Sequence, residues 1–254
     1  MRNIKFTIVT VCFNSELTIK DTIESVINQT YKNLEYIIID GKSSDNTLKI
    51  INTYSNLSFL KIISEKDSGI YDAMNKSIEI STGDYIIFLN SGDRFISKCT
   101  LEKVLENINN NLYDIYYGNI ITTKNNRILE KIKFNNIKID KFNILRGASI
   151  CHQSMFSSVE FMKSEKFDLK YPICADKNFM IKAFKKGANF KYIDLDIAFY
   201  DRTGVSSVQR ERLKKEANEI LLENFPVEQR LMNVIRKIKS IYNFLYRKKG
   251  EGNG

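Results

Sequence analysis

Residues 6–12 read FTIVTVC, and three runs of the same apolar, β-branched character follow: LEYIIID at 34–40, FLKIIS at 59–64 and DYIIFL at 84–89. Runs of this length and composition predict buried strands. Segments of helical period separate them, and strands that alternate with helices form βαβ units in a largely parallel sheet. We therefore expect the first ninety residues to form a compact α/β half of the nucleotide-binding type.

Two helices are predicted between these strands. The first carries one apolar stripe, formed by Ile19, Ile23, Val26 and Ile27. The second carries another, formed by Ile70, Met74 and Ile78. Both stripes have the spacing of a helix face that packs against a sheet. Gly83 is well placed to end the second helix, because glycine adopts the left-handed conformation of a helix C-terminus without strain.

The rest of the chain mixes further strands with helices. Strands are expected at 114–122, 127–134, 152–156, 190–193 and 197–200, with a turn at 124–126. Helices are expected at 175–186, 207–224 and 227–248. We expect one α/β domain over residues 1–206, a helical extension that is amphipathic and basic over 207–249, and a flexible tail at 250–254.

The composition is that of a globular protein without structural zinc or disulfides. The chain has 254 residues, of which 43% are hydrophobic. Its four cysteines are scattered and form no CxxC pair, which fits a reducing cytoplasm. No window approaches the ~20 apolar residues of a membrane span, and the first apolar run is too short and too β-branched for a signal peptide. A cytoplasmic protein that is not integral to a membrane is expected.

The net charge is concentrated near the C-terminus. The whole chain carries +9, and residues 226–249 contain seven Lys or Arg against one Glu. A basic tail is typical of binding either to nucleic acid or to anionic lipid, and composition alone does not choose between them. The chain has no recognised nucleic-acid module and no interleaved aromatic platform, so no nucleic-acid partner is expected.

Polar side chains follow each of the first four predicted strands. The strand ends that carry them read Phe13-Asn14, Asp40-Gly41, Ser64 to Asp67, and Asn90 to Asp93. In open parallel sheets, ligands bind outside the carboxyl ends of the strands. Helix capping would explain Asp45 or Asn46 before Thr47, but not acids directly at the strand tips. Because GxGxxG and GxxxxGK[ST] are both absent, phosphate must be bound by a metal or by Lys and Arg side chains.

Five segments together resemble a known family. They are IIIDGKSSDNT at 37–47, SEKDSGIYDAMNKSI at 64–78, STGDYIIFLNSGD at 81–93, CHQSMF at 151–156 and ADKNFMIKAFKKG at 175–187. In order and spacing they resemble the family 2 glycosyltransferases of bacterial colanic-acid, O-antigen and capsule synthesis, over about residues 6–207. The resemblance implies a GT-A (Rossmann-like) fold, a nucleotide-sugar donor, a divalent metal (Mn²⁺ or Mg²⁺) and usually inversion of the anomeric configuration.

The resemblance also implies roles for individual residues. Asp176 matches the catalytic base, Asp93 the metal ligand, and His152 and Gln153 the segment that faces the acceptor and the diphosphate. The implied nucleotide and donor site comprises Thr10 and Asn14 on a neighbouring loop, Asp40, Asp67, Asp72, Asn75, Lys76, Asn90 and Ser91.

One departure from the family concerns the metal. Many members read Asp-Ser-Asp-Asp where this chain has Asn90-Ser91-Gly92-Asp93, which leaves one carboxylate for the cation. Mg²⁺ commonly uses one or two carboxylates together with substrate phosphate oxygens, so Asp93 with the diphosphate can suffice. Weak metal dependence is the alternative.

Three side chains have a chemical role and a plainer one. Asp176 is expected to be the general base, although it precedes a helix at 177–186 and would serve equally as its N-cap. His152, the only histidine, leads a predicted strand, where it either hydrogen-bonds phosphate or acceptor or is purely structural. Arg202 would neutralise the departing diphosphate from a mobile loop, or is a solvated loop arginine.

The predicted function is transfer of a sugar from a nucleotide diphosphate, with UDP ahead of GDP, to a saccharide acceptor linked to a polyprenyl diphosphate. The alternative is a catalytically silent protein that binds nucleotide sugars or carbohydrate. A second alternative, a nucleic-acid binder that uses the basic tail, lacks a recognised module. The donor sugar, acceptor, linkage and oligomeric state are left open by the sequence.

The last predicted helix suggests how the enzyme reaches a lipid-linked acceptor. Its apolar stripe consists of Leu231, Val234, Ile235, Ile238, Ile241, Tyr242 and Leu245. The cations Arg230, Arg236, Lys237, Lys239, Arg247, Lys248 and Lys249 border or follow that stripe. This pattern is typical of interfacial helices on anionic lipid, which places the enzyme peripherally at the inner face of the cell membrane. The alternative is that the stripe packs on the catalytic domain.

Overall fold

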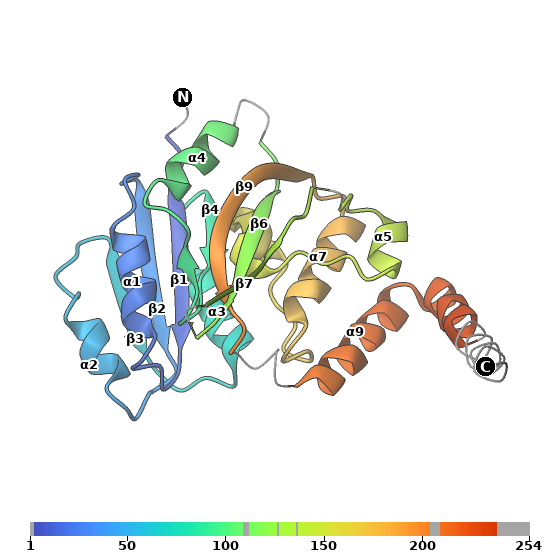
Figure 1. The fold of residues 1–254 in the computed structure, drawn as a ribbon, viewed down its shortest axis with the longest axis horizontal. Coiled ribbons are helices and arrows are strands. Elements are labelled where there is room, and N and C mark those ends of the chain that lie inside the picture. Colours follow the sequence, from blue (N-terminus) through green and yellow to red (C-terminus); the bar gives the residue numbers. More distant parts are fainter. Residues whose placement is uncertain (1–2, 109–111, 126, 136, 204–208, 238–254) are drawn as a thin grey trace, which may run out of the picture.

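The computed structural model describes residues 3–108, 112–125, 127–135, 137–203 and 209–237. Within them, helices cover both faces of one central sheet (Figure 1), which confirms the predicted α/β class. The strands follow the order β3-β2-β1-β4-β8-β6-β9-β5 across the sheet, and β7 pairs with β6. Their bounds are β1 Phe6–Cys12, β2 Leu34–Asp40, β3 Leu60–Ser64, β4 Tyr85–Phe88, β5 Arg94–Phe95, β6 Ile115–Lys124, β7 Arg127–Ile132, β8 Met155–Ser158 and β9 Phe190–Asp201.

The first half of the sheet is parallel, as predicted. β1 pairs in parallel with β2 and β4, and β2 pairs in parallel with β3. The register sets Cys12 opposite Asp40 and Asp40 opposite Ser64. Three strand ends therefore meet at one edge of the sheet, which is where the polar residues were predicted to converge.

The second half of the sheet is mixed. β8 is antiparallel to both β4 and β6, while β9 runs parallel to β6 with register shifts around Asn119. The prediction of two strands at 190–193 and 197–200 is wrong, because β9 is continuous over Phe190–Asp201. Asp194 and Asp196 interrupt its hydrophobic pattern, but they lie where the register shifts and face Lys131, Tyr192 and Asn119.

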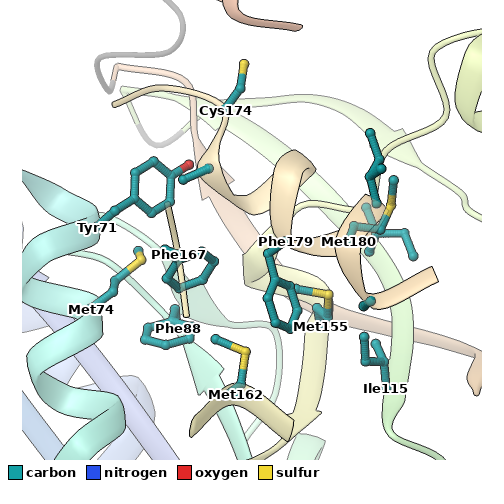
Figure 2. Close-up of a cluster of buried hydrophobic side chains, with 14 of the residues drawn as sticks. Tyr71, Met74, Phe88, Ile115, Met155, Met162, Phe167, Cys174, Phe179 and Met180 are labelled. Carbon is teal, nitrogen blue, oxygen red and sulfur yellow. The ribbon is translucent and has the colours of Figure 1, made fainter. Parts of the chain in front are cut away.

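Two hydrophobic clusters cover the two faces of the sheet. The helices are α1 Ile19–Ile27, α2 Thr47–Asn52, α3 Ile70–Ile80, α4 Thr100–Asn107, α5 Lys141–Leu145, α6 Val159–Ser164, α7 Ala175–Lys185 and α9 Arg210–Asn224. One cluster lies under α3, α6, α7 and α9, and the other under α1, α2 and α4. In the first, the Phe167 ring lies between Tyr71, Phe88 and Phe179 (Figure 2), with centroids 5.1, 5.5 and 5.7 Å away.

Gly83 does not end α3, contrary to the prediction. The helix ends at Ile80, and Ser81 is already extended, with φ −69° and ψ 136°. A Cβ on Gly83 would lie 2.5 Å from the Thr7 hydroxyl and 2.8 Å from the Lys5 carbonyl oxygen. Glycine is required here because the chain passes close to β1, rather than because a helix terminates.

The helices at the C-terminus differ in how they pack. α9 contributes Ile220 and Leu221 to the core, which extends as far as Phe225. A further helix, here called the C-terminal helix, follows at residues 226–237. The predicted residues of this helix from Ile238 onward lie outside the described part. In the portion of the chain that the structure describes, no helix is both long enough and apolar enough to cross a membrane.

Candidate active site

Asp40 organises the loop that follows β2. Its side chain is fully buried, and its carboxylate accepts hydrogen bonds from the Ser43 amide and hydroxyl and from the Ser64 hydroxyl at 2.6 Å. Cys12 lies beside it, and burial together with the Asp40 charge raises the pKa of that thiol far above its ordinary value. Asp40 therefore joins β2 and β3 to the 41–44 loop from below the surface.

Asn14, Asp67 and Phe13 surround Gly41 at the edge of the sheet. Asn14, at a φ of 47°, accepts a hydrogen bond from the Ser44 amide at 2.9 Å. A Cβ at Gly41 would lie 2.6 Å from an Asp67 carboxylate oxygen and 3.4 Å from the Phe13 ring. The Phe13 side chain is 62% exposed. An exposed aromatic ring and a carboxylate are thus side by side, a combination suited to a nucleoside.

Thr10 was expected on a neighbouring loop, but it lies inside β1. It is fully buried, shares a hydrogen bond with the Tyr36 hydroxyl at 2.9 Å and donates to the Leu89 carbonyl at 2.8 Å. Alternate residues of a strand face opposite sides of the sheet, and the Thr10 side chain lies on a side that is covered by other residues. Thr10 thus holds β1, β2 and the end of β4 together.

The three α3 side chains assigned to the donor site each hold a neighbouring segment in place. Asp72 accepts hydrogen bonds from the Ser68 amide and hydroxyl. The hydrogen bond from the amide is the main reason that the pKa of Asp72 is lowered. Lys76 donates to the Lys66 carbonyl and pairs with Glu65 at 2.9 Å. Both amide atoms of Asn75 bond the Phe167 backbone, at 2.9 and 3.0 Å, so Asn75 is engaged in packing.

The loop after β4 buries Asp93. This residue is 3% exposed, and its two oxygens accept from the Gln153 side-chain amide at 3.1 Å and from the Asp201 amide at 3.0 Å. Burial raises the pKa of its carboxyl from 3.8 to about 6, although the Asp201 amide and nearby His152 oppose that rise. Ser91, on the same loop, bonds Thr18 of the segment before α1 at 2.8 Å.

His152 lies between Asn90 and Asp176. It belongs to a short 3₁₀ turn, His152–Ser154, and β8 begins only at Met155, so the prediction that it leads a strand is wrong. Its Nδ1 lies 3.3 Å from Asp176 Oδ2, and its Nε2 lies 2.9 Å from Asn90 Nδ2. In neutral histidine, one ring nitrogen donates and the other accepts. Nδ1 therefore donates to Asp176 while Asn90 donates to Nε2.

The His152 tautomer leaves one oxygen without a partner. With the Asn90 amine directed at His152, Asn90 Oδ1 is buried and accepts no hydrogen bond within the described residues. An orphaned buried oxygen is costly unless a ligand, water or ion satisfies it. Asn90 therefore provides an unused acceptor on the loop that also holds Asp93.

Asp176 lies in the first turn of α7 and is not its N-cap, which is Cys174. One of its oxygens accepts from the Lys177 amide at 2.8 Å and the other faces His152. Its side chain is 17% exposed, so solvent reaches it. A helix N-terminus also stabilises a negative charge. The arrangement can hold a carboxylate ready to receive a proton.

Two residues that matter to this geometry were missed by the sequence analysis. Glu216 of α9 is buried, and one of its oxygens accepts from the Ile173 and Cys174 amides at 2.9 and 3.0 Å, which fixes the start of α7. Asp201 lies at the end of β9 and its amide holds Asp93. The sequence of α9 is mostly polar, so nothing in it indicated that Glu216 is buried. Asp201 could have been found, because it precedes Arg202, which was predicted.

Arg202 follows Asp201, whose amide bonds Asp93, but the Arg202 side chain pairs with β7. Its guanidinium donates to Glu130 of β7 at 2.5 Å, and its amide donates to the Thr123 carbonyl. The side chain is 38% exposed. Its ion pair is therefore of the surface type, which contributes little to stability.

The acidic groups around this edge do not form a complete metal site by themselves. Within the described ranges, no group of three or more His, Cys, Asp or Glu could hold a metal ion. Each Asp93 oxygen accepts one hydrogen bond and keeps a second lone pair, and Asn90 Oδ1 is a further unused oxygen. Hard cations prefer such oxygen ligands, so the residues fit a cation that brings most of its ligands with a diphosphate.

Residues 7–187 match the family model described as "Glycosyl transferase family 2". The chain belongs to glycosyl transferase family 2. A PGL/p-HBAD biosynthesis glycosyltransferase of Mycobacterium bovis (strain BCG / Pasteur 1173P2) is 30% identical over 218 residues, which are 83% of each chain. The UDP-Glc:alpha-D-GlcNAc-diphosphoundecaprenol beta-1,3-glucosyltransferase WfaP of Escherichia coli is 38% identical over 90 residues, 35% of this chain and 36% of that protein.

Two solved structures have the same fold. Residues 1–349 of S. aureus TarS, in complex with UDP-GlcNAc, superpose with a TM-score of 0.68 at 20% identity over 86% of this chain and 66% of that one. A Pyrobaculum calidifontis mannosyltransferase in complex with GDP-Man and Mn²⁺ gives 0.64 at 14% identity, over 86% and 63%. This chain therefore spans about two-thirds of the TarS fragment. The family 2 chain has the predicted GT-A fold, and it is a glycosyltransferase.

Proposed function

We propose that this family 2 enzyme transfers a sugar from a nucleotide diphosphate to a lipid-linked saccharide in bacterial surface polysaccharide synthesis. The observation that carries the proposal is the solvent-reached Asp176 carboxylate, held by His152 and α7 at the same edge as Asp93. The E. coli relative, which by name uses UDP-Glc and a diphosphoundecaprenol acceptor, supports this donor and acceptor class. UDP is proposed ahead of GDP.

The transfer itself needs one base. Asp176 takes the proton of the acceptor hydroxyl while the oxygen of that hydroxyl forms a bond to the anomeric carbon of the sugar. The bond from that carbon to the diphosphate breaks, and a nucleoside diphosphate leaves. Attack opposite the leaving group inverts the anomeric configuration. His152 is a positioning residue, because its Nδ1 proton orients the Asp176 carboxylate while Asn90 holds its Nε2.

The nucleoside is assigned to the Phe13, Asn14 and Asp67 side of the edge. Phe13 offers an exposed ring for stacking, and Asp67 offers a carboxylate next to Gly41. Asp40 acts on the nucleotide indirectly, because its oxygens hold Ser43 and Ser64. Asp72, Asn75 and Lys76 hold the loop and strand connections that border the proposed donor site.

A divalent cation is proposed between Asp93 and the donor diphosphate. When bound, it would neutralise the charge that develops on the leaving group. Asp93 is the protein ligand that we assign, Asn90 Oδ1 lies on the same loop, and Gln153 holds the Asp93 carboxylate in place. We also propose that the enzyme works peripherally at the inner face of the cell membrane, where a lipid-linked acceptor would be found.

Replacement of Asp176 tests the assignment of the base. Asp176→Asn preserves shape and removes the basic oxygen, so turnover of UDP-sugars with a saccharide acceptor should fall by roughly 10²–10⁴-fold. Binding of UDP, measured by calorimetry, should be unchanged. Glu160→Gln is the matched control, because Glu160 is an exposed acid in the first turn of another helix, α6.

Two outcomes would contradict the proposal. If Asp176→Asn loses UDP binding but not turnover at saturating donor, Asp176 belongs to the nucleotide site. If the unaltered protein binds nucleotide sugars without any transfer across a panel of UDP- and GDP-sugars, the silent-binder alternative is correct.

A further inference from the structure

The C-terminal helix at 226–237 packs on the protein through its polar face. Gln229 is fully buried and donates to Asn218 of α9 at 3.0 Å, and Asn233 donates to the same Asn218 oxygen at 3.2 Å. Arg236 donates to the Leu145 carbonyl at the end of α5 at 3.2 Å. The packed face of this helix therefore consists of amides and a guanidinium around the half-buried Met232.

The apolar face of the same helix is directed outward. Val227 is 75% exposed, Leu231 61%, Val234 55% and Ile235 49%. These positions are one helical turn apart and so share one face. Leu231, Val234 and Ile235 belong to the predicted apolar stripe. Their exposure disagrees with the alternative that the stripe packs on the catalytic domain. Arg230 and Lys237 lie one turn before and after Val234 and border the stripe with positive charge.

α5 extends this surface. Lys141 makes an ion pair with Glu228, so the two helices lie side by side at one end of the molecule, away from α2 (Figure 1). Phe142 is 65% exposed, and the Arg146 guanidinium lies 5.1 Å from its ring centroid. A second apolar group with an adjacent cation thus stands next to the helix.

The surface also lies close to the proposed acceptor side of the site. Only residues 146–151 separate α5 from His152. On the other side, Arg236 is near enough to Lys177 to help lower its pKa, although burial is the larger cause, and Lys177 is adjacent to Asp176 in the chain. α5 is thus separated from His152 by six residues of the chain, and Arg236 of the C-terminal helix lies within electrostatic range of the residue after Asp176.

We propose that Phe142, Val227, Leu231, Val234 and Ile235, with Arg146, Arg230 and Lys237, form a docking surface for an anionic lipid bilayer. The inference rests on the proposed function in one respect, since the bilayer is the one that carries the lipid-linked acceptor. Docking through α5 and the C-terminal helix together would bring the membrane to the side of the site that His152 and Asp176 occupy.

Charge favours a bilayer over a second copy of the chain. Residues 226–249 contain seven Lys or Arg and one Glu, so pairing two such helices would bring like charges together. Anionic headgroups are complementary to the same cations, and interfacial helices combine an apolar face with bordering Lys and Arg. An anionic lipid surface is complementary to both the outward stripe and the bordering cations.

The test is co-sedimentation of the full-length protein with vesicles. Binding is expected to phosphatidylcholine vesicles that contain phosphatidylglycerol, to weaken as salt is raised, and to be slight on phosphatidylcholine alone. Leu231→Glu combined with Ile235→Glu should lower the partition coefficient at least tenfold, because two apolar groups are lost and two anions gained. Phe142→Glu should also lower it, and Arg230→Gln should cost about fivefold.

Ile128→Glu is the matched control, because Ile128 on β7 is 66% exposed and lies outside the docking surface. Its vesicle binding should equal that of the unaltered protein. All variants should keep their unfolding temperature and their transfer to a water-soluble acceptor. Loss of transfer only with a vesicle-borne acceptor supports the docking surface.

Three results are decisive. Unchanged vesicle binding in both the double variant and Phe142→Glu overturns the inference. Dimers that Leu231→Glu dissociates, without vesicle binding, assign the surface to a second copy and also overturn it. Vesicle binding that depends on these residues, in a protein that transfers no sugar, upholds the surface and refutes the proposed function instead.

Discussion

Asp93 is a carboxylate held where water hardly reaches it. In the folded protein it takes up its proton at about pH 6, while its ordinary pKa is 3.8. The folded state therefore binds this proton more tightly than the unfolded chain does. Stability falls as pH rises from about 4 to about 6, and the whole penalty is present at pH 7. A residue that costs stability in this way is typical of functional sites.

Asp93→Asn should separate stability from activity. Relative to the unaltered protein, the free energy of unfolding of the variant should be up to roughly 3 kcal/mol more favourable at pH 7 than at pH 4, because each pKa unit corresponds to about 1.4 kcal/mol. The N–H donor that loses its carboxylate oxygen lowers stability at both pH values, and metal-stimulated transfer should be lost. Urea unfolding at the two pH values and a transfer assay with Mn²⁺ check this. Equal stability at both pH values, or full transfer activity, would refute the assignment.

Residue identities at the site were easier to predict than residue partners. Asn90, Asp93, His152, Gln153 and Asp176 were named from motifs, and the structure brings them together. Asn75 was named from a motif and Arg202 from a polar stretch after the last strand, and their side chains bond Phe167 and Glu130. A motif gives a position in the chain, whereas the direction of a side chain depends on contacts with segments distant in sequence.

Among the elements, α9 controls how α7 begins. Glu216, on another helix, accepts hydrogen bonds from the amides of Ile173 and Cys174, the two residues that lead into α7. Asp176 follows two residues after Cys174. The distant helix thus positions the proposed base.

Glu216→Ala should damage both stability and catalysis. Two buried amides would lose their acceptor, which should cost about 2–4 kcal/mol. Turnover should fall while the Michaelis constant for the donor changes little, since the nucleoside side of the edge is untouched. Glu219→Ala on the same helix, where the Lys215 pair is 4.0 Å apart and exposed, should change stability by less than about 0.5 kcal/mol. A purely structural role would leave turnover of the folded fraction intact.

Periodic elements were predicted and irregular ones were not. β1, β2, β3 and β4, and the α1 and α3 stripes, follow from the alternation of apolar runs and helical spacing. α4 and α5 were not recognised, because short helices bury few residues and leave a weak pattern. The 3₁₀ turn at His152 was read as strand because it adjoins β8 and is itself buried.

At the scale of the molecule, the proposed nucleoside side and the proposed acceptor side belong to different halves of the sheet. The parallel half carries Phe13, Asn14 and Asp67, and the mixed half carries His152 and Asp176. Asn90 and Asp93 lie between them, after β4. The parallel half was predictable because each strand is a local run, while the order β8-β6-β9-β5 depends on pairings between distant segments.

UDP should stabilise the whole molecule. At a concentration one hundred times the dissociation constant, a ligand of the native state adds about 2.7 kcal/mol. For a chain of this size the unfolding temperature should rise by about 5–10 °C. GDP should give a smaller shift. Phe13→Ala should reduce the UDP shift because base stacking is lost, and Leu17→Ala, 91% exposed, should not. A larger shift with GDP would assign the other nucleotide.

The register shifts of β9 restrict how the gene can change length. Between Tyr192 and Ala198 this strand uses more residues than β6 does opposite it, and the amide of Asp201 reaches Asp93 only in that count. Alternate strand residues face opposite sides, so one codon inserted or deleted after the shifts would turn every later side chain over. Asp93 would then lose its amide donor without any substitution near it. Amino acids can therefore be exchanged within β9, whereas insertions are expected to be tolerated only in the loops at its ends.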